Sequence, residues 1–306
     1  MANSTAFYAN GTPSSIQDNK TSTHIKTALM VVMFLCFFFF LYFILVILSA
    51  FFTTAQIREN ARYILFAHML VNDTLYLGLG IILFMANVHV LYVPGPVCFW
   101  LYELSSSTFR NTPYNLAVMS LERYVAICLP LRHAELCTCQ RAYAAIGVVW
   151  SLGFIPNVAE MFLMGSSLKN FFSISVLCTQ EVLVLNPIQI IIRSVAFLFN
   201  FALVGLVILY TYIKVMKVAR QMTSNKSSAV KASRTVMLHA FQLLLYMTSL
   251  LYLLMEQFPK QDAEFVPLAK FFTLTCLPRF LSPVIYGIRD ELLRKHMKKF
   301  YPRKLS

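Results

Sequence analysis

Long apolar stretches separated by short polar segments dominate the hydrophobic pattern of the chain. About 20 consecutive apolar residues in a helix suffice to cross the core of a lipid bilayer. The run from Ala28 to Phe52 contains no charged residue and predicts a first membrane-spanning helix. Six comparable runs follow. The predicted spans cover about residues 27–53, 63–88, 97–127, 142–163, 188–213, 235–258 and 267–287.

The composition supports one helical membrane domain rather than several soluble ones. The 306 residues are 58% apolar and only 13% charged, too few polar side chains to cover soluble domains. We therefore expect an all-α membrane protein with a tail over residues 1–26, a seven-helix bundle over 27–287 and a last segment over 288–306. Apolar residues at helical spacing among basic ones in that last segment predict a short amphipathic helix in the headgroups, with a solvated basic tail as the alternative.

Glycosylation sequons and basic residues predict the orientation. Three sequons begin at Asn3, Asn10 and Asn19, which indicates a glycosylated extracellular tail. With the tail outside, 18 of the 26 Lys and Arg residues fall on the inner side. This asymmetry places the C-terminus in the cytoplasm of a multi-pass plasma-membrane protein. Anionic membrane lipid then accounts for the net charge of +13 better than nucleic acid does.

The cysteines and the missing catalytic motifs limit the chemistry. Of seven cysteines, only Cys98 and Cys178 fall on the oxidising outer side, where they are able to pair. Cys137 and Cys139 lie near His133, but the ligand set is incomplete for zinc, so we expect no metal. The sequence has no Gly-rich phosphate loop, nucleophile elbow or HExxH pair, so we expect neither an enzyme nor a cofactor.

A segment at the inner end of the third span carries a family resemblance. It reads Met-Ser-Leu-Glu-Arg-Tyr-Val-Ala-Ile-Cys-Leu-Pro-Leu over residues 119–131. This is similar to the signature of odorant receptors, which are class A G-protein-coupled receptors. The resemblance implies that Glu122 holds Arg123 at rest, beside Tyr124, and that Arg123 is released to a G protein when helices move. A snorkelling Arg at a helix end is the alternative.

Other landmarks extend the resemblance over about residues 27–300. Cys98 lies at the family's distance before Arg123, and Asp73 matches the carboxylate of the second span. Pro283 and Tyr286 resemble the Asn-Pro-x-x-Tyr segment, in which Tyr286 helps to receive Arg123 in the active state. Departures suggest a divergent, fish-type branch, because Ser282 replaces the usual Asn and Pro113 interrupts the third span.

The resemblance implies an odorant receptor that binds a small molecule in the outer half of the bundle and activates a heterotrimeric G protein. A receptor for a peptide or lipid and, from another class, a transporter or channel are the alternatives. Ordinary helix packing is the competing role for each pocket residue. The candidate ligand contacts are Ser105, Ser106, Phe109, Met247, Leu251 and Phe272.

Four charged residues lie inside the predicted spans, and the question for each is which group it contacts. Arg110 and Arg193 offer a positive face to an anionic ligand, or pair internally with Glu103 or Glu160. Asp73 and Arg279 lie at nearly the same depth, so the family alignment brings them within reach of each other. Their pairing would put a tethered guanidinium in place of the sodium ion that neutralises this carboxylate in related receptors; a water-filled cavity or the ligand is the alternative site for Arg279.

Overall fold

The structure is a computed structural model that describes residues 13–164, 172–183 and 187–221. It also describes the single positions Met237, Phe241, Leu244, Cys276, Arg279 and Phe280. Apart from these positions, the predicted sixth and seventh spans lie outside the described residues. The predicted amphipathic helix lies outside them as well.

Five long helices contain the first five predicted spans and confirm them. They are α1 (Pro13–Thr53), α3 (Ala61–Val88), α4 (Gly95–Cys128), α6 (Cys139–Met164) and α9 (Pro187–Gln221). Helix α1 begins well before the span predicted from residue 27. Local signals set several starts: the side chain of Asn60 accepts a hydrogen bond from the backbone of Arg62 at 3.0 Å, which caps α3, and Pro96 lies in the first turn of α4.

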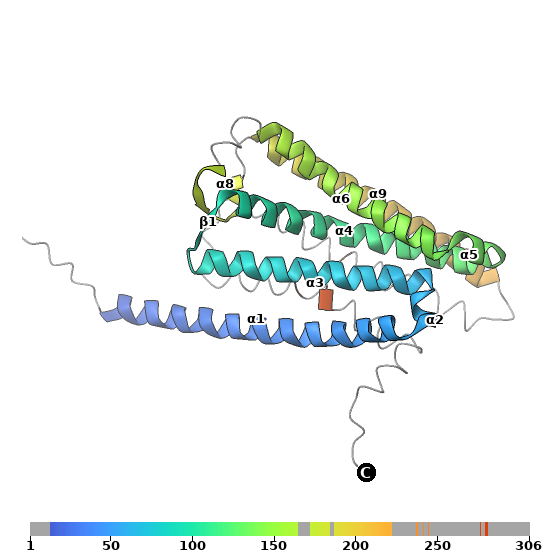
Figure 1. Ribbon diagram of the computed structural model, residues 1–306, viewed down its shortest axis with the longest axis horizontal. Coiled ribbons are helices and arrows are strands. Elements are labelled where there is room, and N and C mark those ends of the chain that lie inside the picture. The colour runs from blue at the N-terminus through green and yellow to red at the C-terminus, as the bar shows by residue number, and fades with distance from the viewer. Residues whose placement is uncertain are drawn as a thin grey trace, which may run out of the picture.

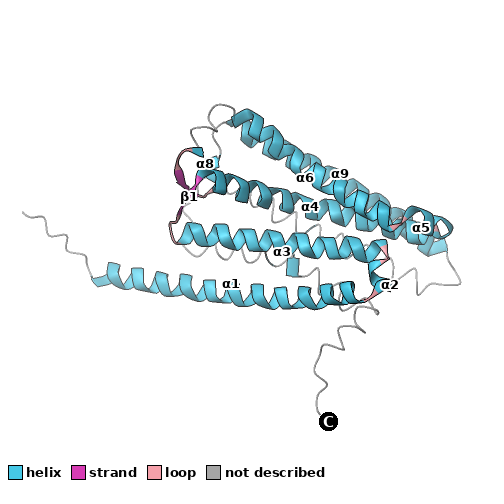
Figure 2. Ribbon diagram, viewed as in Figure 1, coloured by secondary structure: helices cyan, strands magenta, loops and turns pink. Residues whose placement is uncertain are grey.

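Short elements mark the two ends of the bundle (Figure 1). One end, here named the hairpin end, holds β1 (Tyr92–Pro94), β2 (Ser175–Leu177) and α8 (Gln180–Leu183). The strands are antiparallel, with Tyr92 opposite Leu177. The other end, the α5 end, holds α2 (Ala55–Arg58) and α5 (Pro130–Leu136). Figure 2 shows that helix otherwise dominates the described chain.

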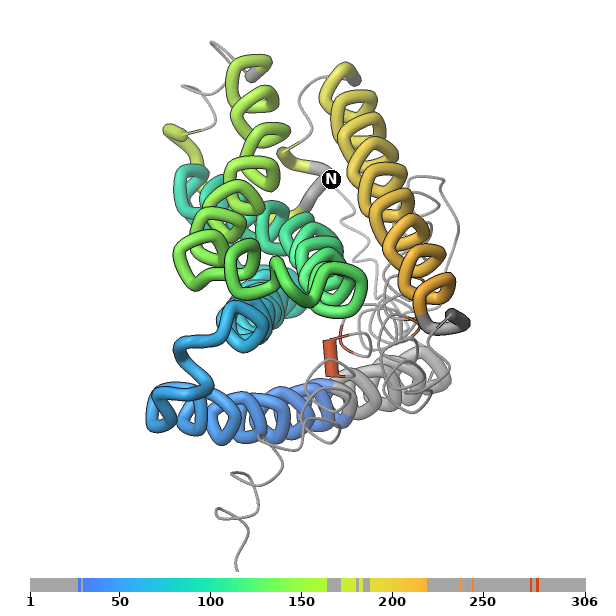
Figure 3. Tube along the Cα trace, turned by 90° about the vertical axis from the view of Figure 1, so that its right-hand side faces the viewer, coloured from blue at the N-terminus to red at the C-terminus, as the bar shows by residue number. Residues whose placement is uncertain are grey.

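Helix α4 is the central helix of the described bundle and is more polar than its neighbours. It packs against α3, α6 and α9 and lies between them in the view turned by 90° (Figure 3). Four described segments are long and apolar enough to cross a membrane: Met30–Thr53, Ala61–Val88, Cys139–Leu163 and Ile188–Val218. Helix α4 is long enough but too polar to be among them, and many of its polar residues are buried against other helices.

Pro113 does not end α4, in contrast to the interruption expected from the sequence. The helix continues through it from Gly95 to Cys128. Proline supplies no N–H, which leaves carbonyls of the preceding turn without their helical donor. The side chain of Asn200 in α9 donates to the carbonyl oxygen of Arg110 at 3.5 Å, so a neighbouring helix supplies a hydrogen bond near this turn.

The apolar core joins α1 to α3 and the α5 end. Phe40, Ile44 and Ile47 form a buried stripe on α1 at helical spacing, whereas Phe39 is 65% exposed on another face. The ring of Phe40 contacts that of Phe280 edge-on, with centroids 4.8 Å apart. Such one-sided burial is expected of a peripheral helix with a lipid-facing side.

Candidate functional site

A cluster of charged side chains surrounds Glu122 at the α5 end of α4. One carboxylate oxygen of Glu122 lies 3.4 Å from Nε of Arg123, and the other lies 3.3 Å from Nε2 of His133 in α5. The side chains of Arg123 and Glu122 are 15% and 8% exposed. Nη2 of Arg123 has no hydrogen-bond partner among the described residues. The guanidinium thus keeps a donor for another partner.

An aromatic side chain, Tyr124, and an apolar one, Leu131, lie near this charged cluster in the sequence. The ring of Tyr124 lies 5.8 Å from that of Tyr210, which connects the end of α4 to α9. Leu131 in α5 is 99% exposed. A large apolar side chain that projects from the end of the bundle is suited to bury itself in a partner protein.

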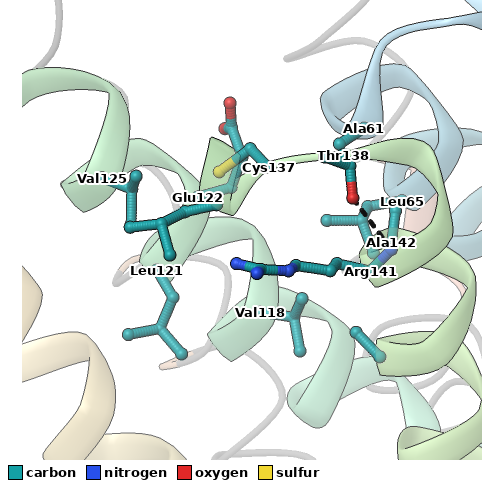
Figure 4. A pocket seen from close by; sticks show the side chains of 12 residues that line it. Ala61, Leu65, Val118, Leu121, Glu122, Val125, Cys137, Thr138, Arg141 and Ala142 are labelled. Atoms are coloured by element: carbon teal, nitrogen blue, oxygen red, sulfur yellow. Dashed lines mark hydrogen bonds between the residues drawn. The ribbon is translucent and has the colours of Figure 1, made fainter. Parts of the chain in front are cut away.

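A cavity of about 170 Å³ opens beside Glu122, between α3, α4 and the start of α6. Apolar side chains of α3 and α4 form much of its wall, and Arg141 of α6 reaches across it toward Leu121 (Figure 4). Cys137 also lines it. Burial raises the pKa of the Cys137 thiol, and the charge of Glu122 raises this pKa further, against a lowering by Arg141. This cysteine is therefore a poor nucleophile at neutral pH.

A buried polar network surrounds Asp73 in the middle of the bundle. Thr112 of α4 donates to Oδ1 of Asp73 at 2.8 Å and accepts a hydrogen bond from Asn72 at 3.0 Å. Nε of Arg279 lies 3.8 Å from the same carboxylate oxygen, and both side chains are 0% exposed. The guanidinium also lies over the ring of Tyr76, 3.8 Å from its centroid. The structure therefore brings Asp73 and Arg279 together through an ion pair and an aromatic face.

Nearer the hairpin end, Arg110 donates three hydrogen bonds to uncharged groups. Its Nε binds the carbonyl oxygen of Gly153 at 3.0 Å, its Nη1 binds Oγ of Ser106 at 2.7 Å, and its Nη2 binds the side chain of Asn157. Asn157 in turn donates to the carbonyl oxygen of Glu103 at 2.8 Å. These contacts tie α4 to α6.

Arg193 forms a second and closer interhelical connection. Its Nε and Nη2 lie 2.7 and 2.5 Å from the same oxygen of Glu160, which joins α9 to α6. Of the two roles expected from the sequence, the structure thus shows Arg193 in the internal pair with Glu160 and Arg110 bound to neutral acceptors. Nη1 of Arg193 is buried without a hydrogen-bond partner among the described residues.

A disulfide joins Cys98 at the start of α4 to Cys178 after β2, with Cα atoms 5.4 Å apart. Phe99, Val176 and Leu183 form a small buried cluster around it. The bridge fixes the segment that follows α6 over the hairpin end of α4.

Sequence comparison adds relatives to this geometry. Residues 45–286 match the family described as 7 transmembrane receptor (rhodopsin family). The chain belongs to that family. It is 30% identical over 255 residues to "Odorant receptor 131-2" of Danio rerio, a match that covers 79% of this chain and 74% of the relative. It is 27% identical over 229 residues to "Olfactory receptor 11G2" of Homo sapiens, covering 71% of this chain and 64% of that relative.

Membership of the rhodopsin family makes this chain a multi-pass plasma-membrane receptor rather than an enzyme. The seven-helix fold class expected from the sequence is thereby confirmed. The chain spans about three quarters of the length of the first relative and slightly under two thirds of that of the second.

The other residues predicted for this receptor's sites fall in two groups. Ser106 accepts from Arg110, the backbone oxygen of Ser105 accepts from Thr108, and the ring of Phe109 lies 5.5 Å from that of Tyr76. The side chain of Ser106 thus has a partner on its own helix, and that of Phe109 contacts α3. The rest lie outside the described residues: Met247, Leu251, Phe272, Pro283, Tyr286, Asn3, Asn10 and Asn19.

Sequence reasoning missed polar residues that hold the receptor's helices together. Asn157 bridges α6 and α4, and Trp150 donates to Nε2 of His68 in α3 at 2.9 Å. Their positions give one signal: Trp150, Gly153, Asn157 and Glu160 recur at helical spacing on α6. A stripe of small and polar residues in an apolar span indicates a helix-facing side.

Proposed function

We propose that this chain is an odorant receptor, which binds a small molecule in the hairpin-end half of the bundle and activates a heterotrimeric G protein at the α5 end. The observation that carries the proposal is the pair of Glu122 and Arg123, a buried carboxylate that holds a guanidinium with a donor to spare. The names of the relatives, an odorant and an olfactory receptor, supply the sensory role.

The pair is weak enough to be released. Glu122 and Arg123 are consecutive in one helix, where neighbouring side chains point about 100° apart and do not face each other. The contact of 3.4 Å therefore needs both side chains to bend, and Arg123 separates from Glu122 by rotation of its own side chain. A G-protein segment that offers backbone carbonyls to the guanidinium, and an apolar pocket to Leu131, would favour the released form.

Helix α4 provides a rigid connection between the two proposed sites. Ser105 and Phe109 lie toward its hairpin end, and Arg123 lies about 27 Å from Ser105 at 1.5 Å per residue. A ligand that favours one arrangement of the hairpin-end halves thereby biases the arrangement at Arg123. We propose uncharged or weakly polar ligands, because Arg110 and Arg193 have internal partners. Carboxylate ligands are then expected to show no advantage in potency over their neutral analogues.

The direct experiment applies a panel of small organic molecules to cells that express the receptor, with a second-messenger readout. Arg123→Ala should abolish the response to every active ligand while ligand binding stays within about threefold of wild type. The matched control is Arg132→Ala, which removes an exposed Arg of α5 outside the Glu122 cluster and should respond like wild type. A full response of Arg123→Ala would refute the assignment, and activity confined to peptides or lipids would replace the odorant role.

We further propose that the hairpin end faces outward and that the C-terminus is cytoplasmic. The inner excess of Lys and Arg and the oxidising environment needed by the disulfide support this orientation. Asn3, Asn10 and Asn19 should then carry glycans, whereas Asn225 should not. Glycosidase treatment should lower the mass of wild type but not of a variant with Gln at the three N-terminal sites. A remaining shift in that variant would reverse or revise the topology.

A further inference from the structure

The cavity beside Glu122 has no role in the proposed signalling step, and its lining divides into an apolar and a basic part. Leu65 of α3, Val118, Leu121 and Val125 of α4, and Ala145 of α6 provide apolar wall. Its volume of about 170 Å³ compares with the engineered apolar cavity of about 150 Å³ that binds benzene. A segment of one hydrocarbon chain fits such a volume, whereas a steroid ring system does not.

Arg141 supplies the polar end of the site. Its side chain extends from the first turn of α6 across the cavity (Figure 4). The hydrogen bond between Arg141 and Thr138 leaves the guanidinium unused, because the backbone nitrogen of Arg141 donates to Oγ1 of Thr138 at 3.3 Å. Among the described residues, no ion pair engages this guanidinium within 4.0 Å. The side chain of Arg141 is exposed.

The depth of the cavity indicates which part of the membrane surrounds Arg141. The membrane-crossing segments of α6 and α3 begin at Cys139 and Ala61, so Arg141 and Leu65 lie within the first turns of their spans. This is the depth at which apolar chains meet the headgroups. Leu121, which lines the cavity on α4, is 39% exposed.

One carboxylate lines the same cavity, and its charge is already compensated. Glu122 uses one oxygen toward Arg123 and the other toward His133, and its side chain is 8% exposed. In Figure 4 its carboxylate lies away from the guanidinium of Arg141. The accessible charge at the cavity is therefore positive.

We propose that this cavity binds one anionic phospholipid of the cytoplasmic leaflet, with its phosphate on Arg141 and part of one acyl chain against Val118, Leu121 and Ala145. The inference rests on the proposed orientation, which turns the α5 end toward the leaflet that is rich in anionic lipid. Because Glu122 forms part of the wall, the bound lipid lies beside the pair that holds Arg123 at rest.

The test measures lipid retention rather than signalling, so its failure leaves the receptor function untouched. Purified full-length receptor in nanodiscs of phosphatidylcholine with phosphatidylserine of the same chains is released into the gas phase, and retained lipid is counted by native mass spectrometry. Wild type should retain one phosphatidylserine in preference to phosphatidylcholine. Arg141→Gln should reduce that retention at least fivefold, and Arg132→Gln, which removes an exposed basic residue elsewhere at the α5 end, should change it less than twofold.

A second pair of variants tests the apolar part of the site. Ala145→Phe fills the cavity and should lower retention as strongly as Arg141→Gln, whereas Ala144→Phe adds the same ring on the exposed side of α6 and should have little effect. Soluble phosphoserine should not compete with the lipid, because it lacks the chain. Equal losses in Arg141→Gln and Arg132→Gln would show diffuse surface attraction, and equal competition by phosphoserine would show a free-anion site; either result overturns the proposal.

Discussion

The helical bundle contains two ion pairs between a carboxylate and a guanidinium that differ in geometry. They therefore differ in the movement that separates the two side chains. Glu160 and Arg193 belong to different helices, and two nitrogens of Arg193 converge on one oxygen at 2.7 and 2.5 Å. Glu122 and Arg123 are neighbours in one helix and share a single contact of 3.4 Å. Separation of the first pair breaks a two-nitrogen contact that links α6 to α9. The second separates when one side chain turns.

Geometry, more than charge, thus distinguishes a fixed link from a releasable one. In the hairpin-end half, Arg110 also donates to Gly153 and Asn157 of α6, so α4, α6 and α9 are connected there at several points. The disulfide further ties α4 to the segment after β2. The α5 end has an exposed Leu131 and an open cavity instead. We infer that the hairpin-end half resists rearrangement more strongly than the α5 end does.

The largest effect should come from the pair at the centre, Asp73 and Arg279, because both side chains are 0% exposed. Removing one partner of a buried ion pair costs about 3–5 kcal/mol. Arg279→Gln should therefore strongly lower surface expression, and addition of Asp73→Asn should recover part of the loss. Signalling should also be insensitive to sodium, since Arg279 already neutralises the carboxylate. Expression of the double variant that equals the sum of the two single losses would show that the residues are uncoupled.

A smaller effect should follow from filling the contact between α6 and α4 at Gly153. A Cβ at this position would overlap the buried side chain of Asn111 and lie 3.3 Å from the carbonyl oxygen of Ser107. Overpacking of this kind costs about 1–3 kcal/mol. Gly153→Ala should thus lower the melting temperature of the purified receptor. Gly147→Ala, with no atom within 4 Å of the added methyl group, is the matched control and should melt like wild type. Equal melting of the two variants would remove Gly153 from the close contact.

The sequence predicted the peripheral helices better than the central one, for a physical reason. Helices α1, α3, α6 and α9 have lipid-facing sides, so their apolar runs are long and easily recognised. Helix α4 is surrounded by other helices, and the motif around Arg123 located it more securely than its hydropathy. The local pattern predicted an interruption at Pro113, whereas α4 continues through it, and a local pattern does not reveal contacts from neighbouring helices such as that of Asn200.

Contacts at the candidate sites could be predicted from the sequence where the two residues are neighbours in one helix or lie at the same depth in two spans. The neighbours Glu122 and Arg123 follow directly from the motif, and the common depth of Asp73 and Arg279 follows from the span boundaries. The pairing of Arg110 with Asn157 does not follow from the sequence, because it depends on which face of α6 is turned toward α4. The cavity at Arg141 likewise arises from three segments that are distant in the sequence.

The most direct test of the contrast between the two pairs neutralises one carboxylate at a time and measures surface expression and ligand-free signalling per receptor in the same cells. Glu122→Gln should raise basal signalling several-fold at near-normal expression, because it releases Arg123 without separating helices. Glu160→Gln should lower expression without raising basal signalling per receptor, because it breaks the link between α6 and α9. The reverse pattern, or the same response in both variants, would contradict the account of a strongly linked hairpin-end half and a releasable pair at the α5 end.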